Sequence, residues 1–271
     1  MGNKRVLIVN ADDYGLTSEV SRGIRFAHQN GIVSSTTAMM NMEGVLADLM
    51  EAVSETPELG IGVHLVLTAG SPVLPISEVP SLVNQNGQFP KIREIYNALP
   101  KIDPDHVYKE WKAQVEKIIG AGVQPDHLDS HHHVSYLDTI LFQTMLLLAS
   151  EYSIPIRRIP SQLTSGLIGT VPINLVDYKA ETGVQSPTGL ETRFYGDSVS
   201  LLLLSTILHE LSSGTTEMMT HPGFVDDALH DKSSYNLSRR TELDILGLKQ
   251  SKDLVSGLDV ELSTFKSLKA T

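Results

Sequence analysis

The chain has 271 residues, 41% of them hydrophobic, a balance typical of a globular protein with a sizeable core. Its 32 acidic residues outnumber its 21 basic ones, and the net charge of -11 disfavours nucleic acid and anionic membrane surfaces as partners. A small neutral molecule fits this charge better. The absence of cysteine excludes disulfide bonds, thiolate metal ligands and a cysteine nucleophile. Any catalysis must therefore use oxygen and nitrogen side chains, and the ten histidines become the residues to follow.

Short β-rich runs alternate with helical patterns, which indicates βα units around a parallel sheet. In chain order, the predicted elements are strand 6–9, helix 19–29, strand 34–40, helix 45–54, strand 61–67, helix 104–119, the segment 125–133, helix 137–151, strand 154–159, helix 201–211, strand 217–220, helix 239–249 and strand 258–262. No repeat, low-complexity tract or linker divides the chain. We therefore predict one domain, residues 1–271, folded as a single TIM-like, distorted β/α barrel with long βα loops.

Two long connections interrupt the alternation. Residues 68–90 contain four prolines, which deny the segment regular structure over more residues than a compact connector needs. Such a loop often covers a site, and the alternative is a surface insertion that costs little entropy. Residues 160–197 have a similar mixed composition.

Three further features concern partners and location. Helix 201–211 is apolar nearly all round, so it is either deeply buried or an interface, and a homodimer is one of these alternatives. No run approaches the roughly 20 apolar residues of a membrane-spanning helix. Only four apolar residues, 6–9, follow the basic N-terminus before polar residues begin, too few for a signal peptide. We expect a cytoplasmic protein.

Four groups of ionisable residues each follow a predicted strand: residues 10–13, His64, residues 127–133 and His221. In a barrel of parallel strands these strand ends lie on one face, so residues far apart in sequence converge on a common mouth. This convergence carries more weight than any single group. The remaining histidines in helical or loop contexts have no partner that the sequence identifies; they are His28, His106, His209 and His230.

Asp12 and Asp13 are adjacent carboxylates in an extended segment, where successive side chains point in different directions. This suggests that the two carboxylates have different roles, in which one binds a metal and the other takes a proton from water. The alternative is a surface turn or helix cap before Tyr14 and Gly15.

Histidines supply the other candidate ligands. His64 is the only ionisable residue of its strand, and by itself it resembles a hydrogen-bonded core histidine. The run of three histidines at 131–133 can turn at least one imidazole into the mouth, and Asp129 can orient a ligand histidine through its second ring nitrogen. His127, His132 and His133 are candidates for support or substrate contact.

One carboxylate and two imidazoles, with the remaining positions left to water, are typical of a catalytic divalent-metal site. These ligand types leave Zn, Mg, Mn, Fe, Co and Ni open. His221, in Thr-His-Pro-Gly at 220–223, is a candidate general acid with a pKa near working pH, the alternative being a structural histidine in a Pro-Gly turn.

Six motifs together resemble the YdjC-like carbohydrate deacetylases. They are Val-Asn-Ala-Asp-Asp-Tyr-Gly at 9–15, Gly-Val-His-Leu-Val-Leu-Thr at 62–68, His-Leu-Asp-Ser-His-His-His-Val at 127–134, Phe-Tyr-Gly at 194–196, Thr-His-Pro-Gly at 220–223 and Thr-Glu-Leu-Asp at 241–244. The resemblance implies a barrel-like α/β fold, a divalent ion, usually magnesium, and removal of acetyl groups from N-acetylated sugars such as chitooligosaccharides.

Carried over by motif, the resemblance implies that Asp13, His64 and His131 bind the metal. By analogy with the wider polysaccharide deacetylase group, it implies that Asp12 is the base. One departure is Ser135, because the family's motif commonly ends His-His-His-Val-His. Serine does not titrate near neutrality, so the role of that last imidazole, and with it the substrate, is open.

Two other functions compete with this interpretation. Non-haem iron oxygenases also use two histidines and one carboxylate, but they usually carry them on a jelly roll rather than on alternating βα units. A non-catalytic sugar-binding protein with a structural ion is the other alternative.

Overall fold

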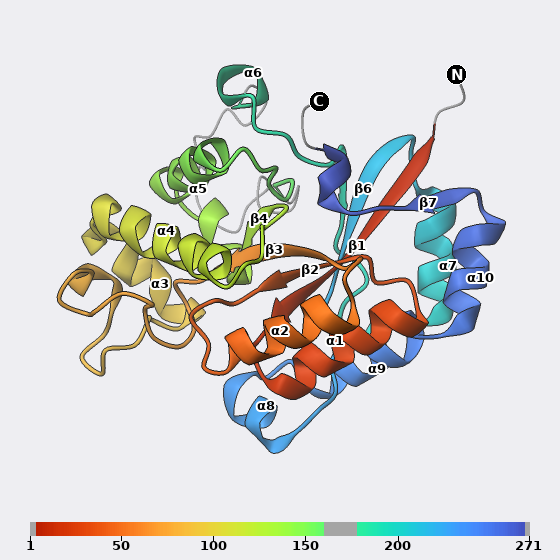
Figure 1. Cartoon of the computed structure of the whole chain (residues 1–271), viewed down its shortest axis with the longest axis horizontal. Coiled ribbons are helices and arrows are strands. Elements are labelled where there is room, and N and C mark those ends of the chain that lie inside the picture. Colours follow the sequence, from red (N-terminus) through yellow and green to blue (C-terminus); the bar gives the residue numbers. More distant parts are fainter. Residues whose placement is uncertain (1–3, 160–177, 269–271) are drawn as a thin grey trace.

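A seven-stranded parallel sheet forms the centre of the structure, a computed structural model that describes residues 4–159 and 178–268 (Figure 1). Its strands are β1 (Arg5–Tyr14), β2 (Ser35–Ala38), β3 (Gly60–Leu65), β4 (Leu128–Ser130), β5 (Gly189–Glu191), β6 (Gly214–Thr220) and β7 (Val260–Leu262). The strand order is β4-β3-β2-β1-β6-β5, and β7 pairs with the first residues of β1. The alternating βα pattern thus predicted the fold class.

The sheet is curled, and its two edges approach each other. Next to β4, the Leu128 N–H donates to Pro155 O, and Ile156 forms a parallel bridge with Leu128. The Ile156 N–H in turn donates to the carbonyl of Gln185, just before β5. The predicted strand 154–159 is reduced to this single bridge, since Pro155 has no N–H to donate. Within the described residues the sheet is therefore a distorted, irregular relative of the regular eight-stranded barrel.

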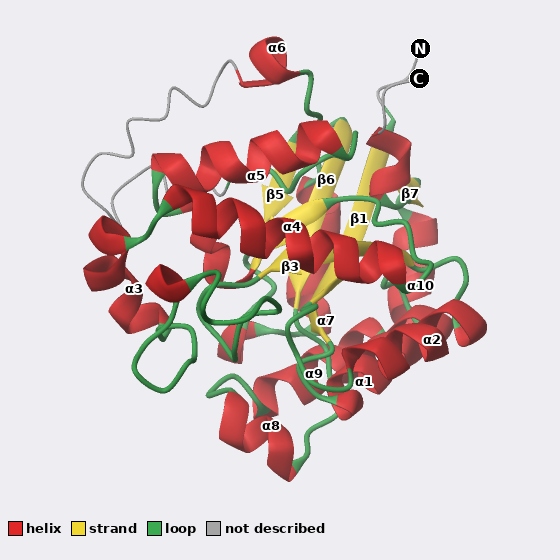
Figure 2. Cartoon of the chain, turned by 60° about the vertical axis from the view of Figure 1, so that its left-hand side comes forward, coloured by secondary structure: helices red, strands yellow, loops and turns green. Residues whose placement is uncertain are grey.

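Helices cover the outer face of the sheet (Figures 1 and 2). They are α1 (Ser18–Asn30), α2 (Val45–Glu55), α3 (Ile92–Ala98), α4 (Pro104–Gly120), α5 (Thr139–Glu151), α6 (Tyr178–Thr182), α7 (Leu201–Glu210), α8 (Asp227–Lys232), α9 (Leu237–Leu246) and α10 (Lys249–Gly257). Local capping explains several starts: Thr17, Asp138 and Ser200 accept hydrogen bonds from the first turns of α1, α5 and α7. The predicted helix 239–249 corresponds to α9, and α10, which begins at Lys249 after Gly247 and Leu248, was not predicted.

The two faces of the sheet differ in chemistry. Along β1, Leu7, Val9 and Ala11 belong to the apolar core, whereas Asn10 and Asp12 are buried polar residues. The polar residues of this and the neighbouring strands hydrogen-bond with one another across the sheet, as described below, which requires them to share its inner face. The curl of the sheet therefore encloses a polar centre, while the apolar face packs against the helices.

The two long connections singled out in the sequence lie within the described residues only in part. Segment 68–90 contains only one short 3-10 turn, η1 (Pro80–Leu82), so it is the irregular loop that its prolines predict. The other connection lies partly outside the described residues, from 160 to 177.

Helix α7 buries Leu204, Ile207 and Leu208 but leaves Leu202 77% exposed. No helix in the described part of the chain is long and apolar enough to cross a membrane.

Candidate active site

A bulge at the end of β1 brings both adjacent carboxylates to the inner face of the sheet. The register of β1 against β2 shifts between Ala11 and Tyr14, and Asp13 has a φ of 72°. A bulge breaks the alternation of side chains along a strand, so neighbours can face the same side. Both aspartates are 2% exposed. The expectation that they point in different directions is wrong, because the bulge turns both to the inner face, although their hydrogen-bond partners differ.

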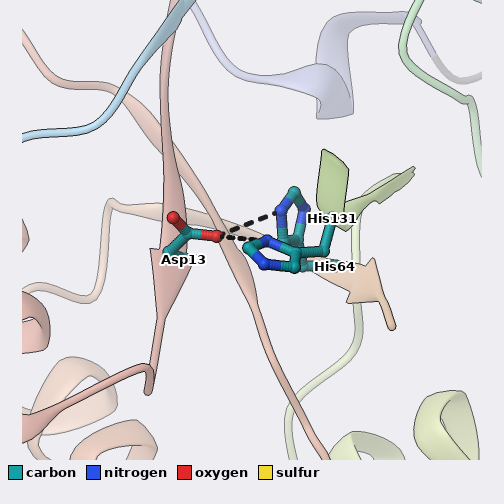
Figure 3. Close-up of side chains that lie close together, drawn as sticks. All are labelled: Asp13, His64 and His131. Atoms are coloured by element: carbon teal, nitrogen blue, oxygen red, sulfur yellow. Dashed lines mark hydrogen bonds and ion pairs between the residues drawn. The ribbon is translucent and has the colours of Figure 1, made fainter. Parts of the chain in front are cut away.

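Asp13 lies at the centre of the candidate metal site (Figure 3). Its Oδ1 lies 3.3 Å from His64 Nε2 and 2.9 Å from His131 Nδ1. These three ligand atoms all lie within 4.8 Å of one another, and the residues come from β1, β3 and the start of η3 (His131–Tyr136). Parallel strands place these ends side by side, so the convergence follows from the topology.

Two of the candidate ligands, His64 and Asp13, each contact a further residue through the atom that does not face the cluster. His64 Nδ1 contacts Asp129 Oδ1 at 2.6 Å, which leaves Nε2 facing Asp13. The second oxygen of Asp13 accepts a hydrogen bond from the Arg239 guanidinium of α9. Such partners fix the orientation and tautomer of a ligand.

A second acidic set, formed by Asp12, His64 and Asp129, also has the spacing of metal ligands. Its two carboxylates, however, already share the guanidinium of Arg157, whose Nη2 lies 2.6 Å from Asp12 Oδ1 and 3.0 Å from Asp129 Oδ2. The Asp13 set keeps its ligand atoms directed at one another and is the better cation site.

The electrostatics of the Asp13 set favour a positive charge. Burial opposes a charged imidazole, but Asp129 and the aspartates of β1 outweigh it and raise the pKa of His64 to about 10. Burial likewise opposes the ionised form of Asp13, yet His131 and Arg239 hold its pKa well below the usual range. A divalent cation with neutral histidines and an ionised aspartate suits this donor set, and its binding would displace protons.

Arg157 organises the buried polar centre. It binds both oxygens of Asp12, at 2.8 and 2.6 Å, and its Nε donates to Glu217 Oε1 at 2.7 Å. Although burial disfavours the carboxylate, Arg157 lowers the pKa of Asp12 below its usual range. Burial raises the pKa of Glu217 to about 7. Asp12 is thus an oriented carboxylate at neutral pH.

His221 follows β6 and faces Asp12, with 3.9 Å between His221 Nε2 and Asp12 Oδ2. Its backbone N–H donates to Glu242, and its ring meets Tyr195 and Tyr235 edge-on. Burial lowers the pKa of His221 to about 4, so the imidazole is neutral at neutral pH. This differs from the pKa near working pH that the sequence suggested, because the imidazole is enclosed.

Of the three consecutive histidines, His131 reaches Asp13. His132 and His133 both adopt the left-handed region, with φ of 56° and 54°, which turns them away from the path of β4. His132 is exposed and contacts Thr68 Oγ1 at 3.0 Å. His133 is neutral, since burial and the nearby Arg157 lower its pKa to about 3.

His127 and Ser135 lie apart from this cluster. The His127 ring stacks on Phe265 with 3.6 Å between centroids, and its Nδ1 contacts Asp126 at 2.6 Å. The Ser135 hydroxyl is buried and bonds to Ser130 Oγ at 2.7 Å, so it supports the turn after β4. Three of the other histidines contact residues outside the site: His28 contacts Val33, His106 contacts Ser81 and Asp103, and His209 contacts Ser205.

Sequence reasoning missed four charged residues of the site: Arg157, Glu217, Arg239 and Glu242. Arg157 follows the isolated bridge at Ile156, and Glu217 lies in β6, neither in a motif. Glu242 belongs to the Thr-Glu-Leu-Asp motif at 241–244, and Tyr195 belongs to Phe-Tyr-Gly at 194–196. These motifs marked the two segments, but the sequence did not show what their residues contact.

Comparisons with known proteins place this chain among described relatives. The model of a family described as YdjC-like protein matches residues 6–256. A relative from Brevibacillus brevis, named carbohydrate deacetylase, is 36% identical over 263 residues, covering 97% of this chain and 99% of that protein. A second protein of that name, from Enterococcus faecalis, is 34% identical and covers 99% of both chains.

Two solved structures are also similar. One, from Enterococcus faecalis and named for cellobiose-phosphate cleavage, has a TM-score of 0.89 and 32% identity, covering 98% of this chain and all of that one. A family 4 carbohydrate esterase from Streptomyces lividans, in complex with acetate, has a TM-score of 0.52 and 10% identity over 98% of this chain and 97% of that one. The second likeness concerns the fold alone.

Proposed function

Because this chain belongs to the YdjC-like protein family, we propose that it is a carbohydrate deacetylase, a hydrolase that removes acetyl groups from N-acetylated sugars. The observation that carries the proposal is the pairing of a metal-type cluster, Asp13, His64 and His131, with the neighbouring pair Asp12 and His221. The products are acetate and an amino sugar. Chitooligosaccharide-like substrates are proposed from the family resemblance.

We propose that Asp13, His64 and His131 hold one divalent ion. When bound, the ion supplies a Lewis acid that polarises the acetamide carbonyl and makes water more acidic. The family resemblance favours magnesium, whereas two imidazoles among three ligands suit zinc or another transition metal. Asp129 supports this proposal because it fixes the ring of His64.

The residues around this cluster divide the proton transfers. Asp12, held as a carboxylate by Arg157, accepts a proton from the attacking water. His221 Nε2 lies 3.9 Å from Asp12 Oδ2, and His221 is neutral before the reaction. The proton that it donates to the departing sugar amine therefore comes from the water by way of Asp12. Arg157 keeps Asp12 aimed at this position throughout.

Three other residues singled out in the sequence have subordinate roles in this proposal. Asp129 orients His64, and His133 is a neutral side chain beside the site that can contact substrate. His127 lies apart from the cluster and has a structural role, through its contacts with Asp126 and Phe265. We also propose that residues 1–271 form one domain with a distorted TIM-like barrel, since the family model spans residues 6–256.

The alternatives are less well supported. An iron oxygenase with this triad usually has a jelly roll, whereas this sheet is parallel and covered by helices. A sugar-binding protein with a structural ion needs no Asp12 and His221 pair beside the ion. Acetate release in the absence of oxygen and of any reductant distinguishes the deacetylase from both.

Acetate release from a panel of N-acetylated sugars tests the function, using metal-stripped protein to which single ions are restored. His131→Ala is expected to lose both metal retention and acetate release, and His221→Ala to retain the metal but lose turnover. His209→Ala, on the exposed face of α7, is the matched control. Full activity of His131→Ala would overturn the metal assignment, and normal turnover of His221→Ala would show that another group is the acid.

A further inference from the structure

Two tyrosine rings stack beside the candidate acid. Tyr195 and Tyr235 lie face to face with 4.2 Å between ring centroids and 8° between ring planes. Both rings meet the His221 ring edge-on, at 5.4 and 5.6 Å between centroids. We call Tyr195 and Tyr235 the tyrosine pair.

The inner ring of the pair is fixed by polar contacts. The Tyr235 hydroxyl donates to Glu242 and accepts a hydrogen bond from the Gly196 N–H at 2.9 Å. Its carbonyl accepts a hydrogen bond from Arg239 Nε, the same guanidinium that holds Asp13. The pair is therefore rigidly connected to the candidate metal cluster.

The outer ring of the pair is open. Tyr195 is 45% exposed, although one face of its ring is covered by Tyr235. Within the described residues, the Tyr195 hydroxyl forms no hydrogen bond. A polar contact of the hydroxyl therefore does not explain why the ring lies here. An exposed aromatic face at a polar site is a surface for an amphipathic ligand.

We propose that the tyrosine pair is the subsite for the sugar ring of the leaving group, with the apolar C–H face of a pyranose stacked on the outer face of Tyr195. This inference rests on the proposed function. His221 faces the departing amine there, and the pair touches the edge of His221, so a sugar on Tyr195 lies beside that amine. The metal cluster lies on the acetyl side. The pair thus selects a cyclic sugar amide over an acyclic one.

Two substitutions of Tyr195 distinguish the contribution of its ring from that of its hydroxyl. If the ring face binds the sugar, Tyr195→Ala raises KM for an N-acetylated disaccharide by about tenfold, as expected for loss of one aromatic stacking contact, with a smaller effect on kcat. Tyr195→Phe keeps the ring and stays within about twofold of wild type, because the change removes no stacking surface. Tyr96→Ala, which removes a 40% exposed tyrosine on α3, is the matched control.

Binding separates this inference from the proposed function. The amino disaccharide product is titrated into metal-stripped protein by calorimetry, where no hydrolysis takes place. The expected result is a Kd that rises about tenfold in Tyr195→Ala and is unchanged in Tyr96→Ala, in step with the KM values. Equal Kd and KM for wild type and Tyr195→Ala overturn the subsite. Sugar binding through Tyr195 without acetate release from any sugar overturns the deacetylase and leaves the subsite standing.

Discussion

At the scale of single residues, a left-handed conformation at Asp13 decides the site. Asp is among the non-glycine residues that adopt positive φ most often, yet the conformation still costs about 1–3 kcal/mol. The cost is met where surrounding contacts specify the conformation, and Asp13 has such contacts in His64, His131 and Arg239. The same device recurs at His132 and His133. At Asp13 the positive φ turns the side chain out of the regular path of its strand.

Glu242 predicts a pH dependence of stability. Burial raises its pKa to about 8, whereas an exposed glutamate titrates near about 4.3. Between these values the folded protein keeps a proton that the unfolded chain releases. The stabilisation is therefore complete below the unfolded pKa and is lost as the pH rises toward the folded pKa, by up to ~1.4 kcal/mol per pH unit.

Urea unfolding of metal-stripped Glu242→Gln between pH 5 and 8 checks this prediction. Relative to wild type, the variant is expected to lose less free energy of unfolding as the pH rises. The pH dependence that remains in both proteins comes from Glu217 and His64, which act with the same sign, and from the buried neutral histidines, which act with the opposite sign. Glu116→Gln, at an exposed position on α4, is expected to keep the full slope. An unchanged slope in Glu242→Gln would show that Glu242 is ionised in the folded protein.

At the scale of elements, α4 holds the irregular loop 68–90 through one buried carboxylate. Glu110 is fully buried and accepts the N–H groups of Val73 and Leu74, at 2.9 and 3.1 Å. Gln114, one turn further along α4, clamps both backbone groups of Val66 at 2.9 Å. A loop with little regular structure is thus fixed at its start by side chains of a neighbouring helix, next to the Thr68 that contacts His132.

Glu110→Ala is expected to free this start of the loop, since the N–H groups of the half-buried Val73 and Leu74 lose their acceptor. Limited proteolysis checks it: cleavage within 68–90 is expected to become faster, while the central strands stay resistant. Glu116→Ala on the same helix is the control. Equal cleavage rates for Glu110→Ala and wild type would mean that other contacts hold the loop.

At the scale of the whole molecule, the candidate metal cluster joins distant parts of the chain. Asp13, His64 and His131 come from three segments, and Arg239 adds α9 from the C-terminal part. A ligand that binds only the folded state stabilises it by RT ln(1 + [L]/Kd), about 2.7 kcal/mol at a hundredfold excess over Kd. An ion bound by these residues therefore stabilises the entire fold.

Removal of metal with a chelator is accordingly expected to lower Tm, and restoring the bound ion to raise it again with increasing concentration. Asp13→Asn is expected to show a Tm that no longer depends on the ion, because the central ligand has lost its charge. Differential scanning calorimetry over an ion series checks this and identifies the ion bound most tightly. A wild-type Tm independent of every divalent ion would contradict the metal site.

The sequence by itself predicted an α/β fold around a parallel sheet and most of the residues that form the candidate site. Alternating βα patterns are local, and so are the motifs that mark Asp12, Asp13, His64, His131 and His221, because each stands at a strand end that periodicity identifies. Parallel topology then makes those ends neighbours, so the convergence of the candidate ligands followed without coordinates.

Only the tertiary structure showed which atoms meet. Arg157 binds Asp12 across 145 residues and Arg239 binds Asp13 across 226 residues, and no local period marks such pairs. The bulge at Asp13 and the irregular closure at Ile156 depend on what packs against them. Burial also decided the protonation of His221, whose pKa falls to about 4 because the folded chain removes it from water. Local sequence patterns determine which helices and strands form, whereas contacts between distant residues and removal from water determine the protonation and orientation of the site residues.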